Sequence, residues 1–164
     1  MKPFRFGVSA WHVASRAELA DKARKVEALG YDTLSFPDHL TDRIAPMPAL
    51  VIAAEATSRL RVGTNVLNND LRNPVLVARE AAAVDLLTDG RLQLGLGAGS
   101  IKSEYDEAGL FFDAGRVRVE RLAEAVTVIK GLLKGEQVTF FGGIIRSPVT
   151  PLTRFRFRSP IRRS

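Results

Sequence analysis

A strand followed by a helix recurs four times along this chain, and this repetition limits the fold more than any other feature of the sequence. The expected strands are short apolar or alternating segments, and a glycine ends three of the four expected helices. Strands are expected at residues 4–10, 31–36, 60–67 and 91–96, and helices at residues 15–30, 49–58, 73–87 and 116–134. Four such units in succession predict a parallel sheet with right-handed crossovers.

The starts of two helices carry clear capping signals. Ser15 and Glu18 have the spacing of a capping box. Asn73 precedes Pro74, which is the order of an N-cap followed by proline in the first turn. Two architectures fit this α/β pattern, an open doubly wound sheet and a TIM (β/α)₈ barrel. A barrel needs about 250 residues, so four units in 164 residues would form half of one.

The positive charge of the chain lies near its C-terminus. The formal net charge is +6, yet residues 1–145 hold 18 basic and 18 acidic side chains, and no acidic residue follows Glu136. The other six basic residues are arginines between positions 146 and 163. A basic body would indicate nucleic-acid binding, whereas a short basic tail does so only weakly, and we expect no specific nucleic-acid partner. We therefore assign residues 1–142 to the α/β region and expect residues 143–164 to be a disordered tail.

Composition excludes several other classes of protein. The chain has no cysteine, which excludes disulfides and thiolate metal sites. No apolar run reaches the roughly 20 residues that span a bilayer, and the N-terminus lacks the apolar core of a signal peptide. We expect a cytoplasmic protein without a membrane partner. The spacing of His12, Asp38 and His39 matches no metal motif, so no metal site is expected.

Chemically useful side chains follow each expected strand. In parallel α/β folds the carboxyl ends of the strands form the functional end of the molecule. The candidates there are Trp11 and His12, Asp38 and His39, Thr64 to Asn69, and Gly97 to Ser100. We expect these four turns to converge on one concave mouth.

Asp38 and His39 are the strongest candidates for acid–base chemistry. Histidine titrates near neutral pH, which suits proton transfer. Neighbouring residues of an extended segment point in opposite directions, so one can face a ligand while the other holds the loop. The alternative is a capping aspartate beside a surface histidine. His12 is expected at the rim, and Trp11 is either a wall for a ring or part of the core.

The segment Gly95-Leu96-Gly97-Ala98-Gly99 resembles a dinucleotide-binding fingerprint. It lacks a glycine at position 100 and follows the fourth strand rather than the first, and no helix is expected directly after it. This makes a dinucleotide site a weak interpretation. The alternatives are a tight barrel turn, or a place where the backbone lies close to a flat ligand.

Several segments together resemble the luciferase-like monooxygenase superfamily. The resemblance covers about residues 3–142, with its motifs in the family's order. They are residues 30–40 (GYDTLSFPDHL), 61–67 (RVGTNVL), 72–99 (RNPVLVAREAAAVDLLTDGRLQLGLGAG) and 103–122. In the branch of F420-dependent oxidoreductases, the Asp-His-Leu turn leads to an Ala-Pro-x-Pro-Ala-Leu helix start, and residues 45–50 read APMPAL.

The resemblance implies a TIM barrel that binds coenzyme F420, a deazaflavin, or alternatively FMN, with the ring at the carboxyl ends of the strands. It implies that Asp38 contacts the cofactor and that His39 faces the reactive centre as proton donor or acceptor. Asn65 and Val66 match a bulge that supports the ring and contains a non-proline cis peptide in relatives. The turn along the ring edge would consist of Gly97, Ala98, Gly99 and Ser100.

The sequence differs from the family in two respects. Position 100 is a catalytic glutamate in related dehydrogenases and a tryptophan in this branch, and Ser100 is neither. Family members are about twice as long, so we expect the first four units of a barrel, in a truncated or frameshifted product or a half-barrel fragment. The predicted function is hydride transfer between F420 and a small organic substrate. An FMN-dependent monooxygenase and a non-catalytic half-barrel are the alternatives, and exposed sheet edges would favour a homo-oligomer.

Overall fold

The computed structural model describes residues 4–10, 12–40 and 44–148. The chain divides into two compact units, Met1–Leu67 with Val84–Gly95 and Asn68–Ala83 with Leu96–Ser164. Each unit has its own buried apolar core.

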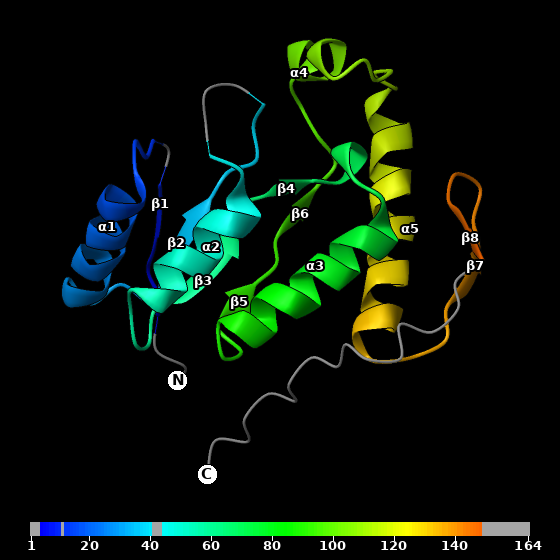
Figure 1. Cartoon of the computed structure of the whole chain (residues 1–164). Helices are drawn as coiled ribbons and strands as arrows, with labels where there is room; N and C mark the ends of the chain where they lie inside the picture. The colour runs from blue at the N-terminus through cyan, green and yellow to red at the C-terminus, as the bar shows by residue number, and fades with distance from the viewer. Residues whose placement is uncertain (1–3, 11, 41–43, 149–164) are drawn as a thin grey trace. The chain divides into compact units, whose positions relative to one another are not determined.

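A four-stranded parallel sheet forms the centre of the first unit (Figure 1). Its strands are β1 (Gly7–Ser9), β2 (Thr33–Phe36), β3 (Arg61–Thr64) and β5 (Leu92–Gln93), and they lie side by side in chain order. A doubly wound sheet reverses its order at a switch point, whereas a barrel keeps chain order. The strand order therefore decides between the two expected architectures in favour of the TIM barrel.

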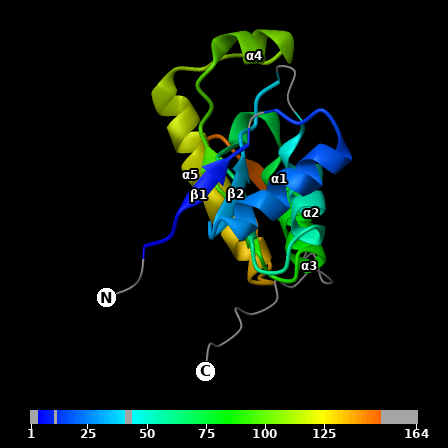
Figure 2. The ribbon, with the colours of Figure 1, turned by 90° about the vertical axis from the view of Figure 1, so that its left-hand side faces the viewer.

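Helices α1 (Arg16–Ala28) and α2 (Pro46–Glu55) lie on the same side of this sheet (Figure 2). Because strand residues alternate between faces, every second side chain points toward these helices. Leu34, Phe36 and Val62 are on that side and are at most 1% exposed. The opposite face carries Thr33 and Ser35 of β2 with other small or polar residues, and neither α1 nor α2 covers it.

The predicted helix starts are confirmed by their caps. Ser15 Oγ accepts a hydrogen bond from the backbone N–H of Glu18 at 3.1 Å, and the Glu18 carboxylate accepts the N–H of Ala14 at 2.8 Å. Helix α3 (Pro74–Leu87) begins at the expected proline, and Asn73 Oδ1 accepts the N–H of Val75 at 2.9 Å. Sequence-local capping fixes both starts, which explains why the sequence alone located them.

The third and fourth predicted strands are each broken into two. Residues 60–67 contain β3 and then β4 (Leu67–Asn68), and residues 91–96 contain β5 and the start of β6 (Leu96–Gly97). The strands β4 and β6 form a separate two-stranded sheet. The break after β3 contains a cis peptide bond between Asn65 and Val66, as the family resemblance implies.

The second unit contains buried residues of α5 (Gly115–Leu133) and of the part of α3 that ends at Ala83. It also contains a 3₁₀ turn η1 (Asn69–Leu71) and a short helix α4 (Lys102–Glu107) in a region expected to be a loop. Helix α4 is only 6 residues long and mostly charged, so it lacks the apolar periodicity that identifies helices. Its buried residues, Glu104 and Tyr105, are adjacent rather than spaced by a helical turn.

A hairpin of β7 (Thr139–Phe141) and β8 (Arg146–Pro148) follows α5 in the second unit. The Glu124 carboxylate on α5 accepts the backbone N–H groups of Gly143, Ile144 and Ile145 at 2.8–3.2 Å. Strand β8 was not expected from the sequence, because its pairing depends on these distant contacts. The turn of the hairpin and β8 together include residues 143–148, the first six residues of the tail that was expected to be disordered. The rest of that tail, residues 149–164, lies outside the described residues.

Candidate functional site

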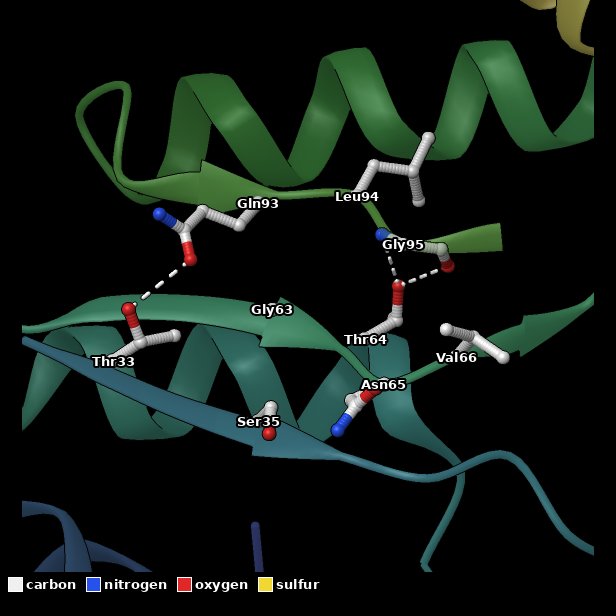
Figure 3. A pocket seen from close by; sticks show the side chains of 9 residues that line it. All are labelled: Thr33, Ser35, Gly63, Thr64, Asn65, Val66, Gln93, Leu94 and Gly95. Atoms are coloured by element: carbon white, nitrogen blue, oxygen red, sulfur yellow. Dashed lines mark hydrogen bonds between the residues drawn. The ribbon is translucent and has the colours of Figure 1, made fainter. Parts of the chain in front are cut away.

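A cavity of about 340 Å³ opens on the polar face of the first unit's sheet, over β2, β3 and β5 (Figure 3). Volumes above about 300 Å³ are typical of small-molecule sites. The lining residues come from β2, from the end of β3 and from β5 with the two residues after it. They are Thr33, Ser35, Gly63, Thr64, Asn65, Val66, Gln93, Leu94 and Gly95.

Close contact between Thr64 and Gly95 closes one side of the cavity (Figure 3). The Thr64 hydroxyl accepts the N–H of Gly95 at 2.9 Å and donates to its carbonyl oxygen at 2.7 Å. A Cβ atom on residue 95 would overlap the Thr64 carbonyl oxygen and lie 3.3 Å from Val66 Cγ1. Only glycine allows this approach, so Gly95 acts here as a spacing residue between two strands.

Neutral hydrogen-bonding groups line the rest of the cavity. Thr33 Oγ1 donates to Gln93 Oε1 at 3.1 Å, and Ser35 Oγ donates to the carbonyl oxygen of Val8 at 3.3 Å. Asn65 is exposed, and its backbone N–H is bonded to the Phe36 carbonyl oxygen at 2.9 Å, which joins the ends of β2 and β3. The lining contains no ionisable side chain. Such a surface suits a neutral polar ring system better than a phosphate group.

Asp38 and His39 lie in the same unit, just after the carboxyl end of β2, but neither lines this cavity. The Asp38 side chain is buried, with 7% of its surface exposed, and His39 is half-buried. Both side chains take part in interactions with neighbouring groups. Register pairs Phe36 with Thr64, which are the last residues of β2 and β3. Asp38 and His39 therefore follow one strand end, and Asn65 follows the adjacent one.

The remaining predicted site residues, Gly97 to Ser100, belong to the second unit. Each unit is defined separately, so the convergence of all four turns on one mouth stays a prediction. Trp11 lies outside the described residues. His12 belongs to the rim of a second cavity of the first unit, of about 540 Å³, between β1 and α1. That cavity is lined mainly by apolar residues with Lys22 and Lys25.

Sequence reasoning placed Asn65 and Val66 at a strand end but did not single out Thr33, Ser35 or Gln93. These three residues occupy alternate strand positions that face away from α1 and α2. The available signal was the run of small or polar residues at every second position of a buried parallel sheet. Parallel strands covered on both faces are usually apolar on both, so such a run indicates a face reserved for a ligand or polar core.

Among residues 4–10, 12–40 and 44–148 there is no cluster of three or more histidine, aspartate or glutamate side chains that could hold a metal ion. No helix in this part of the chain is long and apolar enough to cross a membrane.

A sequence profile of the luciferase-like monooxygenase family matches residues 3–161. The chain belongs to this family. One relative is the F420-dependent glucose-6-phosphate dehydrogenase of Kineococcus radiotolerans, which is 38% identical over 133 residues. The match covers 76% of this chain and 39% of that protein.

Solved structures of luciferase-like enzymes share the fold. The coenzyme F420-dependent tetrahydromethanopterin reductase of Methanopyrus kandleri gives a TM-score of 0.77 at 24% identity, covering 87% of this chain and 44% of that one. A second structure is the oxygenating component of the 3,6-diketocamphane monooxygenase of Pseudomonas putida, solved with FMN. It gives a TM-score of 0.72 at 16% identity, covering 83% of this chain and 39% of that one. This luciferase-like chain thus spans less than half of each of these proteins, and its fold corresponds to about half of their TIM barrel.

Proposed function

We propose that this luciferase-like chain supplies the ring-binding half of an F420-dependent oxidoreductase, which transfers a hydride between the cofactor and a small organic substrate. The observation that carries the proposal is the neutral polar cavity on the face of β2, β3 and β5 that α1 and α2 leave open. The relative named as an F420-dependent glucose-6-phosphate dehydrogenase supports the choice of F420.

The residues present fit a flat ring with polar edges. Ser35 adds only a small side chain to the cavity, whereas Gly63 and Gly95 let the backbone pack closely, because a Cβ at either would overlap the carbonyl oxygen of Gln93 or of Thr64. The hydroxyl of Thr33 and the amides of Asn65 and Gln93 can bond to carbonyl and N–H groups at the edge of a ring. The lining has no positive charge for a phosphate, so the phosphate-bearing part of the cofactor is expected to bind elsewhere.

When bound, a deazaflavin would supply the acceptor for the hydride that leaves a substrate C–H bond, and the residues of this chain would hold the ring and handle the proton. That proton, released from the oxygen of an alcohol substrate, needs a base. His39 is our candidate for this base, because it follows β2 beside the cavity's strand ends and histidine exchanges protons near neutral pH. Asp38 is assigned to cofactor contact, and its burial holds the segment that carries His39.

The proposal is tested by titrating the purified chain with F420 and following cofactor fluorescence. We expect binding weaker than that of a complete barrel by about a hundredfold or more, because the lining offers no positive charge to the phosphate-bearing part of the cofactor. Ser35→Leu fills the cavity and should weaken binding at least tenfold, which corresponds to about 1.4 kcal/mol. Ser58→Leu is the matched control, because Ser58 is exposed and only its backbone N–H is bonded. Glucose 6-phosphate is the first substrate to test, on the strength of the relative's name.

FMN is the second candidate cofactor, because a structural neighbour was solved with FMN. The same titration with FMN shows which of the two cofactors binds more tightly. Tighter binding of FMN than of F420 would favour a flavin-dependent monooxygenase. Failure of the folded chain to bind either cofactor would favour the non-catalytic half-barrel.

A further inference from the structure

Tyr105 is buried in the second unit, and its hydroxyl touches the turn that the family resemblance assigns to the cofactor ring. The residue is 0% exposed. Its hydroxyl lies 3.3 Å from the carbonyl oxygen of Ala98, in the middle of the Gly97–Ser100 turn. Nothing in the proposed function uses this side chain, which comes from α4, the helix that the sequence did not predict.

Gly99 shows how closely the turn approaches this hydroxyl. Its φ is +76°, a left-handed conformation that favours glycine. A Cβ at this position would overlap Tyr105 Oη and lie 2.9 Å from Asn68 Oδ1. The backbone of the turn therefore rests directly on the tyrosine hydroxyl, and a side chain at position 99 would push the two apart.

The hydroxyl is itself held from the other side by a buried charge. Asp70 Oδ2 lies 3.1 Å from Tyr105 Oη, and the side chain of Asp70 is 3% exposed. Arg121 of α5 donates to the same carboxylate oxygen at 2.7 Å and also pairs with Asp113. Burial, followed by the charge of Asp70, raises the pKa of Tyr105, so the hydroxyl keeps its proton.

The tyrosine ring is also fixed in place. Its centroid lies 4.8 Å from that of Phe112, in an edge-to-face arrangement with 77° between the planes. The guanidinium of Arg118 covers the Phe112 ring at 3.9 Å. The hydroxyl thus sits at the end of a rigid, buried side chain, with acceptors from β4, η1 and the turn around it.

We propose that Tyr105 is the positioning residue of the Gly97–Ser100 turn: its hydroxyl, whose single proton goes to Asp70 or to the Ala98 carbonyl but not to both at once, supports the backbone of the turn at Gly99 by direct contact. The effect on cofactor binding rests on the proposed function, in which this turn borders the ring. The effect on the conformation of the turn does not rest on the proposed function.

The first test compares Tyr105→Phe with Tyr31→Phe, the substitution of the only other tyrosine in the chain. Tyr105→Phe keeps the ring and removes the hydroxyl. Without cofactor, the backbone amide signals of Gly97 and Gly99 in ¹⁵N NMR spectra should shift or broaden in Tyr105→Phe and stay unchanged in Tyr31→Phe. Sharp signals at wild-type positions in folded Tyr105→Phe protein would overturn the proposal.

The second test measures F420 affinity. Tyr105→Phe should bind F420 about tenfold more weakly, as expected for the loss of one well-placed hydrogen bond. Equal affinity in the two variants would overturn the role of Tyr105 at the cofactor. If the wild-type chain does not bind F420, the proposed function fails, and the amide signals still decide whether Tyr105 positions the turn.

A third measurement covers the case in which Tyr105→Phe does not fold. In the Tyr31→Phe protein, Tyr105 is the single tyrosine, so ¹³C-labelled tyrosine gives one Cζ signal. Saturating F420 should shift this signal, because the cofactor contacts the turn that the hydroxyl supports. An unchanged signal at saturation would contradict the role of Tyr105 at the cofactor.

Discussion

His39 is the single side chain on which the proposed chemistry depends most. His39→Asn keeps a polar group of similar size and removes the base. We expect turnover with F420 to fall at least 100-fold, the usual lower range for loss of acid–base catalysis, with little change in F420 affinity. His12→Asn is the control, because His12 is the only other histidine and lines the second cavity. Turnover of His39→Asn within threefold of wild type would contradict the assignment.

A position after a strand end marked Asn65 and Val66, but it equally marked Asp38 and His39, which do not line the cavity. Asn65 and Val66 follow β3, and both line the cavity. Thr33, Ser35 and Gln93 were not singled out, because alternation shows which residues share a face but not which face the helices leave open. The role of Tyr105 could not be recognised from the sequence, since its contacts with Asp70 and Ala98 join segments 35 and 7 residues away.

Among the secondary-structure elements, α1 is tied to the start of β3 by one carboxylate. Glu27 accepts the N–H groups of Ser58, Arg59 and Leu60 at 2.8–3.1 Å, and Arg59 donates to the Glu27 carbonyl oxygen at 2.7 Å. Burial by itself raises the pKa of Glu27. The N–H donors and the charge of Arg59 together lower it by more than burial raises it, so the pKa lies below its ordinary value of 4.5.

This contact predicts a pH-dependent contribution to stability. A depressed folded-state pKa means that the stabilisation is present above the ordinary value of 4.5 and is lost as the pH falls through the folded value. Glu27→Gln should lower the free energy of unfolding by about 1 kcal/mol at pH 7, a figure discounted for solvent screening. Urea unfolding at pH 7 and pH 3 measures this.

The difference in the free energy of unfolding between Glu27→Gln and wild type should be smaller at pH 3 than at pH 7. The control is Glu55→Gln, because Glu55 forms an exposed pair with Arg16 and should change stability by less than about 0.5 kcal/mol. A Glu27→Gln effect that is the same at both pH values would contradict the account.

Helices with local caps were predicted almost to the residue, whereas elements that depend on distant contacts were not. α1 and α3 start at the expected residues because Ser15 and Asn73 bond to their own first turns. α4 was missed because its burial depends on Tyr105 rather than on an apolar stripe. β8 was missed because its hairpin is held by Glu124, about 20 residues earlier in the chain.

For the whole molecule, strand order was the decisive observation. The sequence left a doubly wound sheet and a barrel open, and the order β1-β2-β3-β5 matches a barrel. The family profile and the structural neighbours agree with this outcome. The chain spans less than half of those neighbours, and periodicity along one sequence could not have shown which face of the sheet binds a ligand.

The central claim is that F420 binds on the polar face of the sheet rather than in the apolar cavity beside α1. Mapping backbone amide signals by ¹⁵N NMR during an F420 titration tests this most directly. The account predicts that the signals of Gly63, Asn65 and Gly95 shift with one common dissociation constant, since all three line the polar cavity. Shifts confined to Ala10 and Val26, which line the other cavity, or no shifts at saturating F420, would contradict it.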